Sequence, residues 1–255
     1  MDARIENLLR EAGAILAGQF GRGVASAEKD RFDLVTSADR DIEALLAERL
    51  HVLFPSDGFL GEESGEVSGA SGARWLADPL DGTTDFVMGK PYFSVSLARE
   101  EDGRITEGYV FNPVSNELYH STRAEGVSCL NGKRIRVSET CELRRALVVF
   151  GFSARMDRIR RYYEDWGWIF DGCRKGVGWT TPALTLCNVA RGRVDAFFDF
   201  GASPVGHAAA SLILGNAGGV VRNYDLTEYD HRTTGVIGCT PGLLACLARG
   251  EKGST

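Results

Sequence analysis

The chain has 255 residues, 44% of them hydrophobic and 25% charged, and a formal net charge of −6. This composition is that of an ordinary globular protein, and the length is enough for one large domain or two intimately packed ones. The acidic balance without a basic stripe argues against a nucleic-acid partner, and the lack of any apolar run near the roughly 20 residues of a membrane span argues against membrane insertion.

The first part of the chain predicts two helices, the first of them amphipathic. The opening residues carry acids and repeat apolar residues at helical spacing, which predicts a helix over 3–18 rather than a signal peptide. The polar stretch from Ser26 to Phe32 is expected to be a mobile loop. A second helix is predicted over 37–52, with Thr36 and Asp39 as a capping box and an end before Pro55.

The middle of the chain predicts a meander of strands, and the second half alternates strand and helix. The expected strands of the meander are 74–77, 94–99, 105–111, 117–120 and 126–129. The expected elements of the second half are strand 146–150, helices 155–170 and 181–191, strand 194–198, helix 206–216, strands 219–222 and 235–237, and helix 241–248. This order predicts one layered α/β domain over 1–255, with an α+β half over about 1–140 and an α/β half over about 141–250.

The six cysteines form no C-x-x-C pair. Free cysteines are usually buried thiols, and an absence of paired spacing is typical of a reducing compartment. The sequence therefore predicts free thiols and a cytoplasmic location.

Two acidic clusters lie about fifteen residues apart, GEES at 61–64 and DPLDGTTD at 78–85. Like charges repel, so five carboxylates crowded into short segments indicate a cation that holds them together. Oxygen ligands without a nearby cysteine or histidine favour a hard cation, Mg²⁺ first. The sequence therefore predicts a magnesium site at these clusters.

The second cluster is interpreted as a tight turn that aims its oxygens at one point. Pro79 fixes the backbone, so that the carboxylates of Asp78 and Asp81 and the carbonyl of Leu80 can converge. Gly82 lets a ligand approach the backbone, and a helix that begins after it would present free N–H groups to a phosphate. The alternative is an Asp-rich turn that only caps a helix. Glu62 and Glu63 close upstream favour the metal site.

These segments resemble the inositol monophosphatase family of Mg²⁺-dependent, lithium-sensitive phosphatases. The resemblance is carried by DLVTSAD at 33–39, GEES, DPLDGTTDF and NAGG at 216–219, in order, and it covers about 5–245. It implies an αβαβα sandwich of the inositol monophosphatase and fructose-1,6-bisphosphatase type. It also implies a homodimer, Mg²⁺ with Mn²⁺ as a possible substitute, and inhibition by Li⁺ or Ca²⁺.

The resemblance implies roles for the acidic residues. Glu62, Asp78 and the Leu80 carbonyl would hold a first metal, and Asp78 with Asp81 a second. Thr83, together with Glu62, would position and deprotonate the attacking water. Asp39 would support that threonine through a hydrogen bond, while Glu43, four residues further, is interpreted as a surface acid.

The resemblance also implies a substrate-binding set. The backbone N–H groups of Gly82 and Thr83 would bind the phosphate, and Thr180-Thr181-Pro182 would lie near the substrate as a remodelled helix start. Asp199 would contact a substrate hydroxyl, although an acid that ends a strand is the alternative. The residues expected at the substrate are Asp81, Gly82, Thr83, Thr181, Asp199, Gly206 and His207.

The chain departs from the family at Gly206. Gap-free alignment places Val205 and Gly206 at the Trp-Asp pair whose aspartate completes the second metal site. Gly206 is interpreted as a helix N-cap, a place that glycine fills almost as well as threonine. Three explanations stay open. In the first, a second metal arrives with the substrate. In the second, His207 partly substitutes, although a lone histidine in an alanine-rich helix is more often a packing residue and imidazole suits Mg²⁺ poorly. In the third, hydrolysis has been lost and only a phosphorylated ligand is bound, or the aspartate has been replaced artificially.

The sequence thus predicts a Mg²⁺-dependent phosphomonoesterase that acts on a small phosphorylated metabolite, a polyol or sugar-like phosphate such as an inositol monophosphate. Histidinol phosphate, fructose 1,6-bisphosphate and a specialised biosynthetic intermediate remain alternative substrates. A catalytically impaired phosphate-ligand-binding or regulatory protein on the same scaffold is the alternative function.

Overall fold

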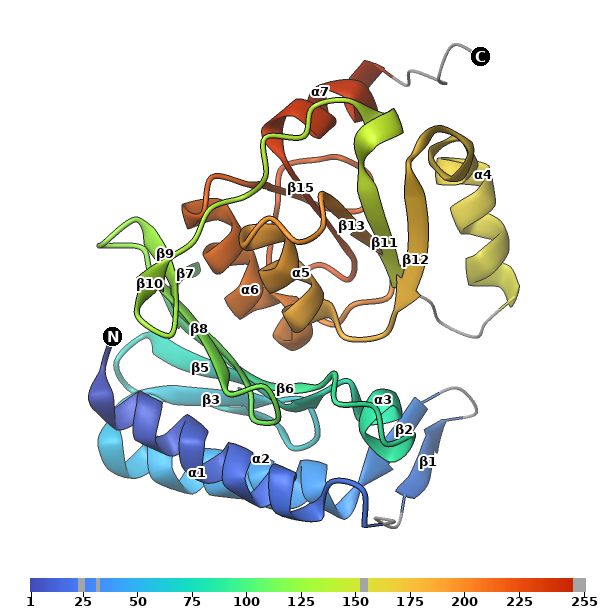
Figure 1. Ribbon diagram of the computed structural model, residues 1–255. Coiled ribbons are helices and arrows are strands. Elements are labelled where there is room, and N and C mark those ends of the chain that lie inside the picture. Colours follow the sequence, from blue (N-terminus) through green and yellow to red (C-terminus); the bar gives the residue numbers. More distant parts are fainter. Residues whose placement is uncertain (23–25, 31–32, 152–155, 250–255) are drawn as a thin grey trace.

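Five layers of secondary structure stack in the order α, β, α, β, α (Figure 1). The computed structural model describes residues 1–22, 26–30, 33–151 and 156–249. The layer order confirms the predicted αβαβα sandwich. Among the described residues, no helix has both the length and the apolar character needed to cross a membrane.

The first helical layer and the first sheet form the lower half in Figure 1. Helix α1 (Ala3–Gln19) buries the apolar face predicted from its periodicity, and α2 (Ser37–Leu53) packs beside it; Asp2 and Thr36 cap their N-termini. The sheet has the strand order β10-β9-β8-β7-β6-β5-β3-β4. Its strands are β3 (Gly58–Gly61), β4 (Gly65–Val67), β5 (Ala73–Asp81), β6 (Ser94–Glu101), β7 (Arg104–Asn112), β8 (Glu117–Thr122), β9 (Val127–Leu130) and β10 (Lys133–Arg134).

The meander prediction holds for β5 to β10, which pair antiparallel, whereas β3 runs parallel to β5. A short hairpin of β1 (Ser26–Asp30) and β2 (Asp33–Thr36) precedes α2, and the short helix α3 (Thr83–Val87) follows β5.

The second sheet and two further helical layers form the upper half. Its strand order is β12-β11-β13-β15-β14, in which β12, β11 and β13 are parallel and β15 and β14 antiparallel. These strands are β11 (Leu147–Gly151), β12 (Lys175–Trp179), β13 (Ala196–Asp199), β14 (Val220–Arg222) and β15 (Val236–Cys239). The helices are α4 (Met156–Gly172), α5 (Pro182–Ala190), α6 (Pro204–Asn216) and α7 (Pro241–Arg249), with a 3₁₀ turn η1 (Leu143–Arg145) before β11.

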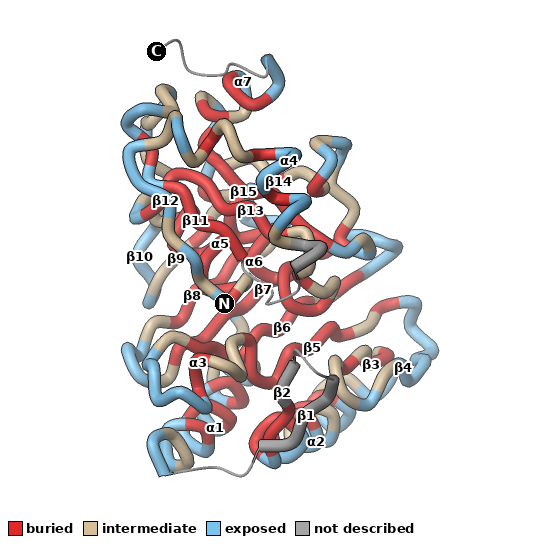
Figure 2. Tube along the Cα trace, turned by 90° about the vertical axis from the view of Figure 1, so that its right-hand side faces the viewer, coloured by how far each residue is buried: buried red, intermediate tan, exposed pale blue. Residues whose placement is uncertain are grey.

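Three apolar cores fill the spaces between the five layers. One lies between α1, α2 and the first sheet, and a second packs α4 and α7 on the outer face of the second sheet. The largest surrounds α5 and α6 and joins the two sheets, with Leu76 and Val110 from the first half and Val149 and Phe197 from the second. Every residue from Val205 to Leu214 in α6 is buried, and Figure 2 shows this buried trace at the centre of the molecule.

Several local predictions were wrong. The expected loop at 26–32 is strand β1 over Ser26–Asp30, because pairing with β2 satisfies a polar backbone without an apolar pattern; residues 31–32 lie outside the described residues. Strands β3, β4, β10 and β12 were missed, because they are short or rich in glycine and charge. The acidic turn is the continuation of β5, and the helix expected from 206 begins at Pro204. The expected helix 155–170 runs over Met156–Gly172, and residue 155 is not among the described residues.

Candidate metal centre

The acidic segment lies on a central strand and contains a bulge. In β5, Asp78 pairs with Ser96 and Asp81 with Ser94 of β6, and the register shifts between these two pairs. Pro79 sits at this shift, where its missing N–H costs the sheet no hydrogen bond. A bulge re-aims side chains. Asp78 and Asp81 are each only 4% exposed.

The buried carboxylates raise one another's pKa. The pKa of Asp78 lies well above its usual range because the group is buried and because Glu62 and Asp81 are negatively charged neighbours; Glu62 also shares a hydrogen bond with it. Burial likewise raises the pKa of Asp81, against hydrogen bonds from Ala183 N at 2.9 Å and Ser94 Oγ at 3.3 Å. Glu62 and Asp81 therefore lie close enough to Asp78 to act on its charge, and a cation beside this cluster would offset the repulsion.

The donor set fits Mg²⁺ rather than a metal held entirely by side chains. Among the residues that the structure describes, no three or more acidic, histidine or cysteine side chains form a ready-made ligand cage. Mg²⁺ usually keeps several waters and takes only one or two carboxylates with substrate oxygens. The converging carboxylates and the Leu80 carbonyl meet that requirement with oxygen atoms alone.

A hydrogen-bonded pair of Thr83 and Asp39 adjoins the carboxylates. Thr83 Oγ1 lies 3.1 Å from Asp39 Oδ1 and 3.0 Å from the Leu80 carbonyl oxygen, so the hydroxyl can donate to either. Asp39 Oδ2 accepts from both N and Oγ1 of Thr36, each at 2.7 Å, which confirms the predicted capping box. Burial raises the pKa of Asp39 against these hydrogen bonds. The hydrogen bond between Thr83 and Asp39 that the family resemblance implies is thus present.

Gly82 occupies a position that only glycine fills without strain. Its φ is +98°, in the left-handed region, and it is the N-cap residue of α3. A Cβ there would lie 2.7 Å from Thr181 Oγ1 and 3.0 Å from the Tyr92 carbonyl oxygen. The end of β5 therefore packs tightly against the start of α5, and the first turn of α3 begins at Thr83 as expected.

Gly206 faces the carboxylates, but it is not the N-cap of its helix. Helix α6 begins at Pro204, so its N-cap is Ser203. The Oγ of Ser203 accepts from Gly206 N at 3.1 Å. A Cβ on Gly206 would lie 3.3 Å from Asp78 Oδ2. A side chain at this position would therefore point toward Asp78, as the alignment with the family's aspartate requires.

His207 is completely buried and uses both ring nitrogens for hydrogen bonds elsewhere. Nδ1 lies 2.8 Å from Tyr229 Oη, and Nε2 lies 3.0 Å from the Thr233 carbonyl oxygen. Burial lowers its pKa to about 4, so the ring is neutral near pH 7. These bonds leave no ring nitrogen for a cation or a substrate, and they favour the packing role over the ligand role.

Two further predicted substrate residues are occupied by local contacts. Asp199 Oδ1 accepts from Gly201 N at 2.7 Å and Ala202 N at 3.0 Å, which is the contact expected of an acid that ends a strand. Thr181 is completely buried, and its hydroxyl lies 3.0 Å from the Tyr92 carbonyl oxygen and 3.3 Å from Asp85 Oδ2. The structure therefore places Thr181 beside the candidate site, with its hydroxyl directed at Asp85 and Tyr92.

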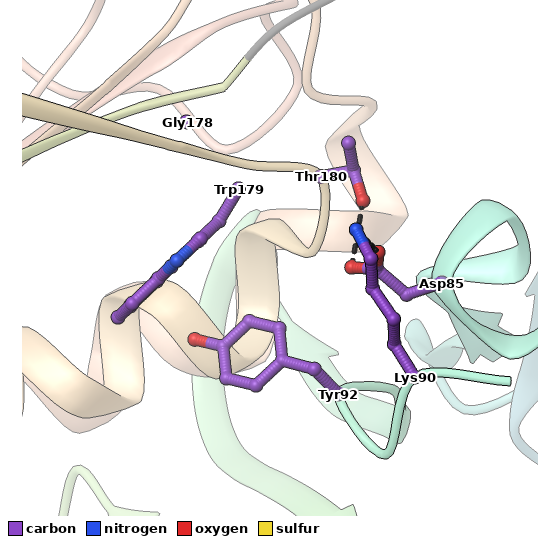
Figure 3. A pocket seen from close by; sticks show the side chains of 6 residues that line it. All are labelled: Asp85, Lys90, Tyr92, Gly178, Trp179 and Thr180. Carbon is purple, nitrogen blue, oxygen red and sulfur yellow. Dashed lines mark hydrogen bonds and ion pairs between the residues drawn. The ribbon is translucent and has the colours of Figure 1, made fainter. Parts of the chain in front are cut away.

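A pocket of about 390 Å³ (Figure 3) reaches Thr180, the residue that precedes Thr181 in the chain. It is lined by Asp85, Lys90, Tyr92, Gly178, Trp179 and Thr180. Lys90 Nζ lies 3.1 Å from Asp85 Oδ1, and Thr180 Oγ1 donates to Asp85 Oδ2 at 2.8 Å. Figure 3 shows Trp179 across the pocket from this charged group. Thr180 was expected near the substrate. Lys90, Tyr92, Gly178 and Trp179 were not predicted, because they lie in the loop after α3 and in β12, a strand that was not predicted.

The interpretation of Glu43 as a surface acid was wrong. The residue is 3% exposed, and its carboxylate accepts from Glu63 N and Ser64 N. The spacing of four from Asp39 on α2 was the available signal, since residues four apart share a helix face. That signal does not say what the face contacts.

Converging acidic oxygens, a supported threonine and a layered αβαβα fold define a class of metal-dependent phosphatase scaffolds. A model of the inositol monophosphatase family matches residues 1–251, and the chain belongs to this family. It is 35% identical to the Nus factor SuhB of Escherichia coli K12 over 219 residues, which cover 84% of this chain and 82% of that protein. It is also 35% identical to the Nus factor SuhB of Pseudomonas aeruginosa, with 93% and 92% covered.

Solved structures agree with this assignment. The extragenic suppressor protein SuhB of Bartonella henselae superposes with a TM-score of 0.91 at 30% identity and covers 96% of each chain. The inositol monophosphatase (IMPase) of Thermotoga maritima superposes with a TM-score of 0.86 at 29% identity, over 95% of this chain and 93% of that one.

Proposed function

We propose that this chain is a Mg²⁺-dependent phosphomonoesterase that acts on a small polyol or sugar-like phosphate. The observation that carries the proposal is the convergence of Glu62, Asp78 and Asp81 beside the hydrogen-bonded pair of Thr83 and Asp39. Membership of the inositol monophosphatase family supports it.

The metal ligands in this proposal are the carboxylates of Glu62, Asp78 and Asp81 and the Leu80 carbonyl. Mg²⁺ bound there would lower the pKa of water and offset the charge of a phosphate. Asp39 accepts from Thr83, which fixes the threonine oxygen as an acceptor for the attacking water. In this proposal the carboxylate of Glu62, together with Thr83, would take the proton of that water.

The remainder of the substrate would lie in the 390 Å³ pocket next to Thr181. The Asp85–Lys90 pair offers acceptors and donors to hydroxyl groups, and Trp179 offers an apolar face across from them. A polar ring or chain of moderate size fits this lining. Inositol monophosphate, histidinol phosphate and fructose 1,6-bisphosphate are the esters to compare.

The test is phosphate release from these three esters and from glycerol 2-phosphate, with Mg²⁺ titrated. We expect turnover that requires Mg²⁺, and we expect Asp81→Asn to lower kcat/KM by about 100-fold or more through lost metal affinity. Asp102→Asn, which removes an exposed carboxylate from a turn, is the matched control. Near-normal rates in Asp81→Asn would contradict the proposed metal site.

A second candidate function is favoured by two specific observations. Gly206 provides no carboxylate where the family aligns one, and relatives at 35% identity bear the name Nus factor, which is not that of a hydrolase. A phosphate-ligand-binding or regulatory protein on the same scaffold would bind an ester without releasing phosphate at any Mg²⁺ concentration. The acidic net charge is not by itself sufficient to exclude a macromolecular partner for such a protein.

The other expectations from the family resemblance form part of the same proposal. They are a homodimer, a cytoplasmic location, substitution of Mn²⁺ for Mg²⁺, and inhibition by Li⁺ or Ca²⁺.

A further inference from the structure

We propose that Glu43 is the positioning residue for Glu62 and that it sets the affinity of the carboxylate cluster for Mg²⁺. The inference rests on the metal site of the proposed function. Glu43 lies on α2, and it acts through the backbone of the segment that carries Glu62 rather than by contact with metal or substrate.

The Glu43 carboxylate holds two consecutive amides of that segment. Glu63 N donates to Oε2 at 2.9 Å, and Ser64 N donates to Oε1 at 2.6 Å. Glu43 is 3% exposed, so these hydrogen bonds are shielded from water. Hydrogen bonds from N–H groups to an ionised carboxylate are roughly twice as strong as neutral ones. Each carboxylate oxygen is therefore used to fix the turn directly after Glu62.

The backbone before Glu62 is shaped around the same carboxylate. A Cβ on Gly61 would lie 2.4 Å from Glu43 Cδ and 2.6 Å from both carboxylate oxygens. Such distances are far inside van der Waals contact, so a Cβ at position 61 would have to displace the Glu43 carboxylate from its present place. Glu43 thus contacts the chain on both sides of Glu62.

Glu62 itself is tied to the strand that carries the other acids. Its N–H donates to the Ala77 carbonyl oxygen at 3.2 Å, one residue before Asp78. With Gly61 packed on Glu43 and the next two amides bound to it, the backbone of Glu62 is held on each side. The direction of the Glu62 side chain toward Asp78 follows from this restraint.

Helix α2 consequently supports both parts of the site from one face. Asp39 holds Thr83 through a hydrogen bond, and Glu43, one turn later, holds the segment of Glu62. Residues four apart on a helix are neighbours on one face. A single helix therefore holds both Thr83 and the segment of Glu62, through two residues one turn apart.

The decisive experiment compares Glu43→Gln with wild type in Mg²⁺ titrations by calorimetry and in hydrogen exchange of the amides of residues 62–64. Glutamine keeps the size of the side chain but replaces one acceptor oxygen with an amide group that faces an N–H donor. We expect faster exchange at Glu63 and Ser64 and a Mg²⁺ dissociation constant raised about 10-fold or more, as for other groups that orient metal ligands. Glu48→Gln, an exposed glutamate on the same helix, is the matched control.

A second variant reaches the same contact from the other side. Gly61→Ala pushes on the carboxylate without removing it, and it should weaken Mg²⁺ binding in the same direction if Glu43→Gln folds poorly. Faster exchange at residues 62–64 with unchanged Mg²⁺ affinity in both variants would overturn the inference, because it would mean a purely structural contact. Wild-type protein that binds no Mg²⁺ at all would instead refute the proposed metal site, while the exchange data would still report the Glu43 contact.

Discussion

At the scale of single residues, contacts between sequence neighbours could be predicted and contacts between distant residues could not. The sequence predicted Thr36 and Asp39 as a capping box, because both partners lie three residues apart on one helix end. It did not predict the burial of Glu43, whose partners are twenty residues away in a turn without a periodic pattern. Residue patterns identify pairs that are close in the sequence, whereas contacts between distant residues can be identified only from the folded structure.

Gly206→Asp tests the residue that departs from the family. The new carboxylate would start from a Cβ 3.3 Å from Asp78 Oδ2, so its charge adds to a group of anions that already raise one another's pKa. Without a divalent ion we expect a lower thermal midpoint than in wild type. With Mg²⁺ we expect a larger rise of the midpoint and a dissociation constant lowered about 10-fold, since an added ligand charge favours the metal.

Gly206→Ala is the control, because it supplies a Cβ and better helix propensity without charge. Thermal midpoints in EDTA and in Mg²⁺ would be measured for all three proteins. An aspartate variant whose Mg²⁺ response equals that of the alanine variant would contradict the alignment of Gly206 with a metal ligand.

At the scale of elements, the predictions succeeded where a pattern was long and failed where burial was set by neighbours. Helix α1 followed from apolar spacing over several turns, and α2 from its capping box and the proline beyond its end. The acidic segment read as a turn because Pro79 and Gly82 are typical turn residues. In the structure it continues β5 through a bulge, because β6 pairs with it on both sides of the proline. No sequence pattern reports a partner strand.

The packing of α6 on β7 gives an element-scale prediction. A Cβ on Gly108 would lie 2.5 Å from the Ala209 carbonyl oxygen, so Gly108→Ala must push the helix from the strand. We expect a loss of about 1–3 kcal/mol in the free energy of unfolding, typical of overpacking. Gly18→Ala, on α1 with no atom within 4 Å of its Cβ, should instead stabilise by up to about 1 kcal/mol. Urea denaturation measures both, and equal effects would contradict the packing argument.

At the scale of the whole molecule, the two halves share their largest core. The cluster around α5 and α6 contains Leu76 and Val110 from the first sheet and Val149 and Phe197 from the second. The order of the longer elements could be predicted from the residue patterns, and the layers could be predicted from the family resemblance. The chain passes from the first sheet to the second between β10 and β11, near residue 140. The core around α5 and α6 that joins the two sheets could not be predicted from composition.

We therefore expect one cooperative unfolding transition for the chain. Trp75 reports the first half, and Trp166 lies in the core of the second, so tryptophan fluorescence and far-UV circular dichroism should give coincident urea curves. A fragment of residues 1–140 should not fold cooperatively, because the face of its sheet that packs on α6 would be exposed. Two separated transitions, or a stable fragment, would show that the halves are independent.

The hydrogen bond from Ala183 N to Asp81 links the candidate metal site to the packing between the two halves of the molecule. The donor belongs to the first turn of α5 and the acceptor to the end of β5. The position of Asp81 therefore depends on the packing of the second half against the first. Separation of the two halves would break this hydrogen bond, so Asp81 keeps this restraint only while α5 packs on β5. If the proposed function holds, activity would therefore depend on the packing between the two halves as well as on the acidic residues themselves.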